Sequence, residues 1–154
     1  MRLLLAICFL ISPIKGYITL QSGTYPVYTA YIEDNKWNEE YWNQQLAWLD
    51  GTGWVNNNYP PVIVSHTYGY LNEILQYDEN SRIYIYEYPY TYTYKFTYLE
   101  TISTNDELTR RYTQQNSELL LMICDPIQEN SRYIAHLSLE SVVYTGYYVY
   151  NSEN

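Results

Sequence analysis

The sequence predicts a single, mainly β domain, and three observations lead to that fold class. The chain has 154 residues, the size of one domain that can bury a core of its own. Every even-numbered position from Tyr84 to Tyr98 is aromatic, and a period of two over that length is typical of β-strands. Apolar runs of strand length, bounded by turn residues, recur along the rest of the chain. We therefore expect a sheet-based fold with a few helical turns.

The composition indicates a folded, acidic protein with aromatic residues on a wet sheet surface. Hydrophobic residues make up 47% of the chain, and tyrosine outnumbers phenylalanine by 22 to 2, so most aromatic rings carry a hydroxyl group. The net charge is −9 at pH 7. Nucleic acid and anionic lipid bind basic surfaces, so this charge argues against both as partners.

The first residues have the pattern of an export segment. An arginine precedes the apolar run 3–11, which has the length of a signal-peptide core and is well short of the ~20 residues of a spanning helix. We expect residues 1–16 to be an export signal or short anchor, and residues 17–154 to form an exported domain at the cell surface, membrane-associated or secreted. Cleavage after Gly16 and an uncleaved anchor both stay open, because Ile14 stands where a second small residue is expected. A buried N-terminal strand is the alternative.

The N-terminal half of the domain is predicted to contain short strands and helical turns. Two β-like runs come first, at 17–20 and 26–31. Residues 38–49 carry apolar side chains at spacings of four and three, which predicts a short helix. After a loop and a third apolar run at 61–65, one or two helical turns are expected around residues 71–75.

The C-terminal half is predicted to contain a hairpin and two further strands. The aromatic run turns at Tyr88-Pro89-Tyr90, because proline cannot continue a central ladder. We interpret its rings as cross-strand pairs with each other and with threonines that stabilise the sheet, and a platform for stacking sugars or bases is the alternative. A polar connection, read as a loop with a helical turn, follows at 101–116. The strands 118–124 and 133–143 complete the domain.

Three residues of complementary chemistry lie at the ends of predicted strands. Cys124 closes one apolar run, and Arg132 follows eight residues later at the start of the last strand. His66 closes the run 61–65. Strand ends and their loops are the usual place for a site on a β scaffold. A thiol nucleophile, an imidazole that exchanges protons near neutrality and a guanidinium that binds an oxyanion together suit acyl transfer.

Each of these residues also has a plainer interpretation. Because Cys8 lies in the export segment, Cys124 is alone in the mature chain, and such a thiol is either buried and inert or retained for chemistry. The alternatives for His66 and Arg132 are a surface-loop histidine and a strand-end cation. The second histidine, His136, alternates with apolar residues in the last strand, so we expect it to face solvent.

The order of these parts resembles the sortases, which are exported cysteine transpeptidases of bacteria. The resemblance spans about residues 18–143 and is strongest over 48–66 and 92–124. It implies a closed, mixed eight-stranded β-barrel with short helices. It also implies that His66, Cys124 and Arg132 are the catalytic residues.

The resemblance has two departures beside the candidate site. Where sortases have Thr-Leu-x-Thr-Cys, this chain has Leu120-Leu-Met-Ile-Cys124, so both threonines are replaced by apolar residues. Ser65 stands where a glycine usually precedes the histidine. These departures concern the grip on the substrate and the rate rather than the three catalytic residues.

The implied reaction is cleavage of an LPxTG-like sorting motif through a thioester on Cys124. The acyl group then passes to an amine, so the implied partners are the sorting-signal peptide of an exported protein and an amine acceptor, either a cell-wall peptide or a pilin lysine. Two other functions stay open. One is an exported, tyrosine-rich β protein that binds a surface partner, and the other is a cysteine hydrolase on the same fold.

The sequence contains no metal motif with convincing ligand spacing, no phosphate-binding glycine loop and no nucleotide fingerprint. We therefore expect neither a cofactor nor a metal. Asp34, Glu39 and Glu40 form the acidic group that would suit a calcium ion, as in some sortases, and we interpret it as a solvated acidic face.

Overall fold

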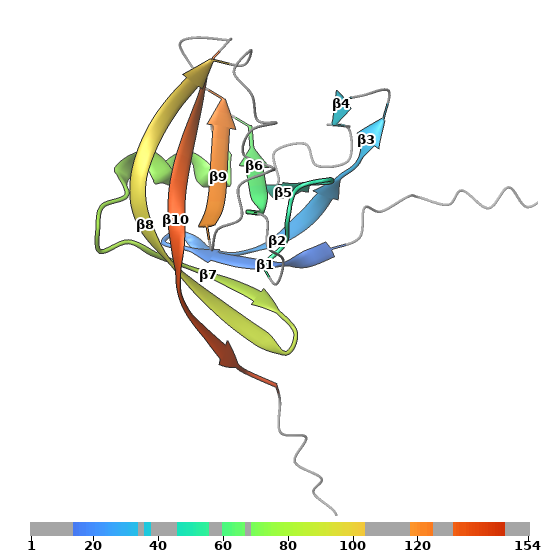
Figure 1. Cartoon of the computed structure of the whole chain (residues 1–154), viewed down its shortest axis with the longest axis vertical. Helices are drawn as coiled ribbons and strands as arrows, with labels where there is room; N and C mark the ends of the chain where they lie inside the picture. The colour runs from blue at the N-terminus through green and yellow to red at the C-terminus, as the bar shows by residue number, and fades with distance from the viewer. Residues whose placement is uncertain are drawn as a thin grey trace, which may run out of the picture.

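Eight strands close into a barrel in the computed structural model of the chain (Figure 1). The structure describes residues 14–33, 36–37, 46–55, 60–66, 69–103, 118–124 and 131–146. The elements are β1 (Ile14–Leu20), β2 (Gly23–Ala30), β3 (Ile32–Glu33), β4 (Lys36–Trp37), β5 (Leu46–Leu49), β6 (Val62–Ser65), the 3₁₀ helix η1 (Tyr70–Gln76), β7 (Arg82–Glu87), β8 (Tyr90–Ser103), β9 (Glu118–Cys124) and β10 (Ser131–Tyr144). Around the barrel the order is β1-β2-β5-β6-β9-β10-β8-β7, and β3 pairs with β4 apart from it. The predicted mainly β, closed eight-stranded fold is confirmed.

The barrel is mixed in strand direction. β2 and β5 run parallel, as do β6 and β9, whereas the other neighbours in the barrel are antiparallel. Parallel neighbours need a crossover connection. Between β6 and β9 that crossover contains η1 and the β7–β8 hairpin, so two strands distant in sequence end side by side.

Two apolar clusters pack on the two faces of one side of the barrel. The inner core fills the barrel and includes, from β5, β6 and β9, the residues Leu46, Trp48, Ile63, Leu119, Leu121 and Ile123. The outer core lies on the opposite face and consists of Ala30, Ala47, Leu49, Val62, Val64, Leu120, Met122 and Ile134. Strands buried on both faces are continuously apolar rather than alternating. This two-sided burial explains the uninterrupted runs that the sequence shows at β6 and β9.

Most of the predicted elements are confirmed, with shifted ends. The runs at 17–20, 26–31, 61–65, 118–124 and 133–143 form β1, β2, β6, β9 and β10, and the turns around 71–75 form η1. β1 begins at Ile14, earlier than expected, and β8 extends into the polar connection as far as Ser103. The rest of that connection, 104–116, lies outside the described residues.

The helix predicted over 38–49 is wrong where it can be compared, because Leu46–Leu49 is the strand β5. Leu46 and Trp48 belong to the inner core, whereas Ala47 and Leu49 belong to the outer core. A short strand that buries every residue produces apolar spacings of three and four as readily as a helix does. Residues 38–45 lie outside the described part of the chain.

The aromatic hairpin turns where the sequence predicts, with a cis peptide bond between Tyr88 and Pro89. The aromatic side chains lie on the outer face of the barrel in β7 and on its inner face in most of β8. In β7 the isoleucines point into the inner core and Tyr84 points outward, whereas in β8 the inward side chains are Tyr92, Tyr94 and Phe96. Tyr84 accordingly pairs with Thr93 across the hairpin. These aromatic and threonine pairs are the sheet-stabilising arrangement that the sequence predicts.

Hydrogen bonds link η1 to the turn between β1 and β2. The Glu73 carboxylate accepts hydrogen bonds from the backbone N–H groups of Gln21 and Ser22 at 2.7 and 3.0 Å. It also accepts one from the Tyr77 hydroxyl. Burial and the Glu73 carboxylate raise the pKa of Tyr77 above its ordinary value, so this hydroxyl keeps its proton and remains a donor.

Candidate active site

The ends of three neighbouring strands bring the predicted site residues to one edge of the barrel (Figure 1). β6 and β9 run parallel with Ser65 opposite Ile123, so His66 and Cys124 are the next residues of adjacent chains. β10 runs antiparallel to β9, and Arg132 is the direct partner of Cys124. The backbone register therefore sets Cys124 between His66 on one side and Arg132 on the other.

Packing on both faces fixes the end of β9 at this edge. Leu121 and Ile123 lie in the inner core, and Leu120 and Met122 lie in the outer core. Ile123, one of the residues that replace a threonine of the sortase pattern, is only 1% exposed. Its apolar side chain is thus part of the barrel interior, which explains why an isoleucine is stable there.

The backbone carbonyl of His66 is hydrogen-bonded to Ser65 and Gly69. The His66 carbonyl accepts hydrogen bonds from the Gly69 N–H at 2.8 Å and from the Ser65 hydroxyl at 3.3 Å. A Cβ atom on residue 69 would lie 1.9 Å from the Ser65 Oγ and 2.8 Å from the His66 carbonyl oxygen. The Ser65 hydroxyl group therefore fills the space that a side chain on residue 69 would need, which explains the glycine at that position. Ser65, which replaces the usual glycine, holds the backbone of the half-buried His66 in place.

Arg132 lies in the middle of a three-stranded ladder. Its backbone pairs with Cys124 on β9 and with Ile102 on β8. The guanidinium donates a hydrogen bond from Nη1 to the Ser131 carbonyl oxygen at 2.8 Å, and the Ser131 hydroxyl donates to the Ile102 carbonyl oxygen at 3.3 Å. A guanidinium has five N–H donors in a fixed plane. The half-buried Arg132 is thus a multiple hydrogen-bond donor that is tied to its own strand by one of these bonds.

The expectation that His136 faces solvent is wrong, because its side chain is completely buried. Its ring lies between two carboxylates, with Nε2 2.9 Å from the Glu100 Oε2 and Nδ1 3.4 Å from the Glu118 Oε2. The ring also stacks on Tyr98 at 4.1 Å between centroids and 12° between planes. The alternation correctly sets His136 on the outer face of β10, but side chains of β8 and β9 cover that face.

This group of Tyr98, Glu100, Glu118 and His136, the histidine clamp, joins three adjacent strands. Sequence reasoning missed it because its members come from β8, β9 and β10, and their spacing in the chain carries no motif. His136 is four residues from Arg132 along β10, or about 13 Å at the usual rise of a strand. The clamp is therefore separate from the edge that holds Cys124.

Within the described ranges, no group of three or more His, Cys, Asp or Glu side chains is arranged to hold a metal ion. The acidic group of Asp34, Glu39 and Glu40 lies outside those ranges. No helix in the same part of the chain is long and apolar enough to cross a membrane.

Comparison with known proteins identifies the family. The Sortase domain family model matches residues 20–140. No curated protein matches the chain by sequence. Similar solved structures include sortase C-3 from Streptococcus pneumoniae, with a TM-score of 0.70 and 18% identity over 94% of this chain and 71% of that chain.

Two sortase A structures are also similar. The enzyme from Listeria monocytogenes has a TM-score of 0.70 and 17% identity over 85% of this chain and 90% of that chain. The enzyme from Corynebacterium diphtheriae has a TM-score of 0.69 and 16% identity over 84% of this chain and 62% of that chain. At these identities the structural likeness shows the fold, and the family model covers most of the sequence. The chain belongs to the sortase family.

Proposed function

We propose that the protein is a cysteine transpeptidase that cleaves a sorting-signal peptide at an LPxTG-like motif and transfers the acyl group to an amine. The observation that carries this proposal is the backbone register of three strand ends, which sets Cys124 opposite Arg132 and one residue beyond the pairing of Ser65 with Ile123. Family membership supports the reaction class. Export of the chain, with residues 1–16 as signal or anchor, is part of the same proposal.

In the first half of the reaction, the Cys124 thiolate attacks the scissile carbonyl carbon. An unperturbed thiol has a pKa of about 8.5 and is mostly protonated at neutral pH, so a nearby cation assists ionisation. Attack forms a C–S bond and moves the carbonyl electron pair to oxygen. Arg132 donates hydrogen bonds to that oxyanion. Collapse breaks the C–N bond, and the protonated His66 gives its proton to the departing amine. The product is a thioester on Cys124.

In the second half, the acceptor amine attacks the thioester. The now neutral His66 takes a proton from the incoming amine as the new C–N bond forms. The C–S bond breaks and returns the thiolate, while His66 is protonated again. Water in place of the amine gives hydrolysis by the same steps. The acceptor is therefore the reactant that separates a transpeptidase from a hydrolase.

The test is product analysis with a library of Leu-Pro-x-Thr-Gly-like peptides, with and without an added amine such as an oligoglycine or a lysine derivative. A transpeptidase should give an amide joined to the added amine, in an amount that grows with amine concentration. Only free acid at every amine concentration would contradict transfer and leave the hydrolase. No cleavage of any library member would contradict the sorting-peptide substrate.

A further inference from the structure

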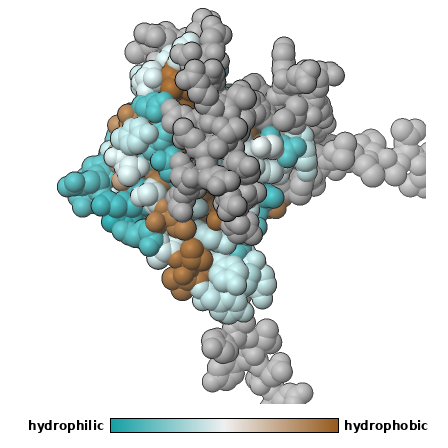
Figure 2. Space-filling model, viewed as in Figure 1, coloured by the Kyte–Doolittle hydropathy of each residue, from teal (hydrophilic) through white to brown (hydrophobic). Residues whose placement is uncertain are grey.

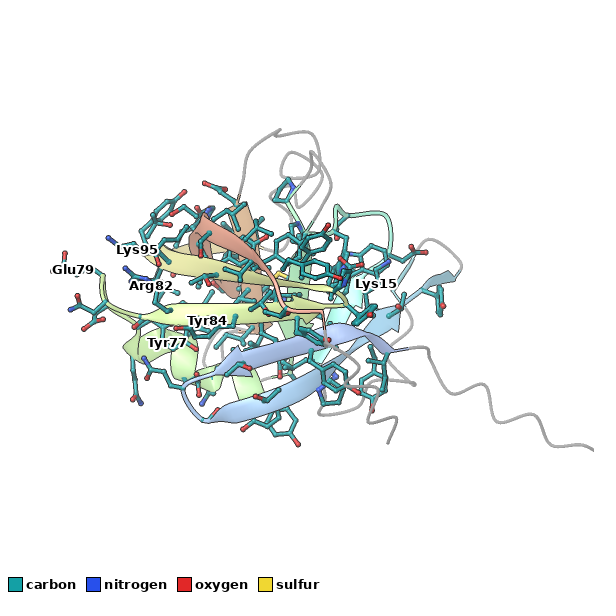
Figure 3. All side chains as sticks on the ribbon, turned by 90° about the horizontal axis from the view of Figure 1, so that it is seen from below. Lys15, Tyr77, Glu79, Arg82, Tyr84 and Lys95 are labelled. Carbon is teal, nitrogen blue, oxygen red and sulfur yellow. The ribbon has the colours of Figure 1, made fainter. Side chains whose placement is uncertain are left out.

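The start of β1 carries a lysine whose ammonium group lies over two indole rings. The Lys15 Nζ is 4.4 Å from the ring centroid of Trp48 and 5.6 Å from that of Trp54. The rings themselves meet edge to face, 5.9 Å apart with an interplanar angle of 72°. A cation within about 6 Å of an aromatic centroid is attracted by the ring quadrupole, and tryptophan gives the strongest attraction. In Figure 3 Lys15 lies at the opposite end of the view from Lys95 and Arg82.

Both rings are packed into the inner core of the barrel. Trp48 and Trp54 are 9% and 5% exposed, and the Trp48 indole N–H donates to the Gly53 carbonyl oxygen at 2.6 Å. Gly16 brings β1 close to them, since a Cβ atom there would lie 2.9 Å from the Tyr86 carbonyl oxygen and 3.2 Å from the Trp54 ring. Side chains locked by packing in this way lose little entropy when a ligand binds.

A carboxylate completes the site. Burial raises the pKa of Glu87, while the Trp54 indole and the Lys15 ammonium lower it without cancelling the effect of burial. The Trp54 N–H is itself buried and makes no hydrogen bond of standard geometry within the described part of the chain. The Lys15 ammonium group thus lies over two tryptophan rings, and the Glu87 carboxylate on β7 attracts the same ammonium group. We call Trp48, Trp54 and Glu87 the tryptophan cage.

The cage is separate from the candidate active site. Trp48 pairs with Ile63 near the start of β6, whereas His66 follows the end of that strand. Nothing in the proposed reaction uses Lys15 or the cage.

We propose that the tryptophan cage is a binding site for primary alkylammonium ions and that Lys15 is its intramolecular ligand. The aromatic faces take the cation and the alkyl stem, and Glu87 supplies the opposite charge. Occupied by Lys15, the cage fastens the beginning of β1 to the barrel. A chain that began at Tyr17 would lack this ligand and leave the cage open to a lysine side chain or another alkylammonium group.

The test uses the full chain with Lys15→Ala and a titration with n-butylammonium chloride, followed by tryptophan fluorescence and thermal unfolding. We expect saturable binding with a dissociation constant on the order of 1–10 mM. At 100 mM ligand the Tm of the variant should rise by about 3–8 °C. Should Lys15→Ala be unfolded at 25 °C, butylammonium should restore the folded state. Sodium chloride at equal ionic strength and 1-butanol should do neither.

Matched variants separate the cage from general charge effects. Lys95→Ala removes a lysine elsewhere on the barrel and should respond to butylammonium no more than the wild-type chain does. Lys15→Met fills the cage with an uncharged side chain and should not bind. Adding Glu87→Gln to Lys15→Ala should weaken binding at least about threefold. Equal responses of Lys15→Ala and Lys95→Ala, or undiminished binding with Glu87→Gln, would overturn the proposal.

Discussion

Two sides of this barrel are built differently. On the side formed by β5, β6 and β9, which we call the two-sided wall, nearly every described side chain is buried, because the inner core packs on one face and the outer core on the other. On the side formed by β7 and β8, which we call the one-sided wall, residues alternate between the inner core and a solvent-exposed face rich in tyrosine and threonine. A strand held on both faces can shift little at its end, and the proposed catalytic edge lies on that side.

The one-sided wall extends beyond the barrel at its lower end. There the last residues of β10 are exposed, with Val142 at 47% and Val143 at 52%. Figure 2 shows hydrophobic atoms at that end of the molecule, where Figure 1 draws the end of β10. Burial on both faces, rather than strand length, therefore distinguishes β6 and β9, which lead to His66 and Cys124, from β7 and β8.

The largest expected effect is the difference in catalytic activity between alanine variants of His66 and His136. His66→Ala should lower kcat/KM for peptide cleavage by roughly 10²- to 10⁴-fold with little change in Tm, because the leaving amine loses its proton donor. His136→Ala should do the reverse. It empties a buried position between two carboxylates, which costs about 1–3 kcal/mol of stability, while kcat/KM of the folded protein stays within about threefold of wild type. Equal losses of activity in the two variants would contradict the assignment.

A matched pair of leucines tests the two walls. Leu120→Ala opens a cavity in the outer core of the two-sided wall and should lower the free energy of unfolding by about 2–5 kcal/mol. Leu99→Ala changes an exposed residue of β8 and should cost less than about 1 kcal/mol. Urea denaturation of both variants measures the difference. Similar midpoints would show that the two walls contribute alike and that two-sided burial does not set the stability of the site edge.

Arg132→Lys tests geometry against charge at the candidate site. A lysine keeps the positive charge but loses the planar fork of donors, so kcat/KM should fall at least about tenfold. Arg82→Lys is the control, because Arg82 forms a bidentate surface pair with Glu140 at 2.7 and 2.9 Å, far from Cys124. Its activity should match wild type. An Arg132→Lys enzyme as fast as wild type would reduce Arg132 to a strand-end cation.

The smallest effect concerns the surface of the one-sided wall. Arg82 lowers the pKa of Glu140, so the pair contributes stability above the carboxyl pKa of the unfolded chain and loses it as pH falls through the lowered value. Glu140→Gln should therefore lower Tm slightly at pH 7, and this difference should shrink as the pH falls through the lowered pKa of Glu140. The difference should also shrink in high salt, because both groups are exposed. A Tm difference that does not change with pH would show that Glu140 acts through packing instead.

Much of the fold was predictable because the β pattern is local. The aromatic alternation of the hairpin, the strand ends at His66 and Cys124, and Arg132 at the start of the last strand are all visible in the sequence. β5 was missed because a strand buried on both faces has no alternation. The burial of His136 was missed because Glu100 and Glu118 approach it only through strand pairing.

The N-terminal boundary stays a prediction. Ile14 pairs with Tyr28, Gly16 pairs with Val27, and Lys15 lies in the tryptophan cage. Removal of residues 1–16 would thus take away the beginning of β1. The sequence alone does not separate these two interpretations, because an export segment and a β-strand can both begin with apolar residues.

The most direct test of the central claim is the mass of the intact protein during turnover of a Leu-Pro-x-Thr-Gly-like peptide in the absence of amine. We expect a mass increase equal to the acyl part of the peptide, located on Cys124 by digestion and removed by hydroxylamine as a thioester should be. Cys124→Ala should remain folded, carry no adduct and release no product. Cleavage by Cys124→Ala at the wild-type rate, or an adduct on another residue, would contradict the claim that Cys124 is the nucleophile.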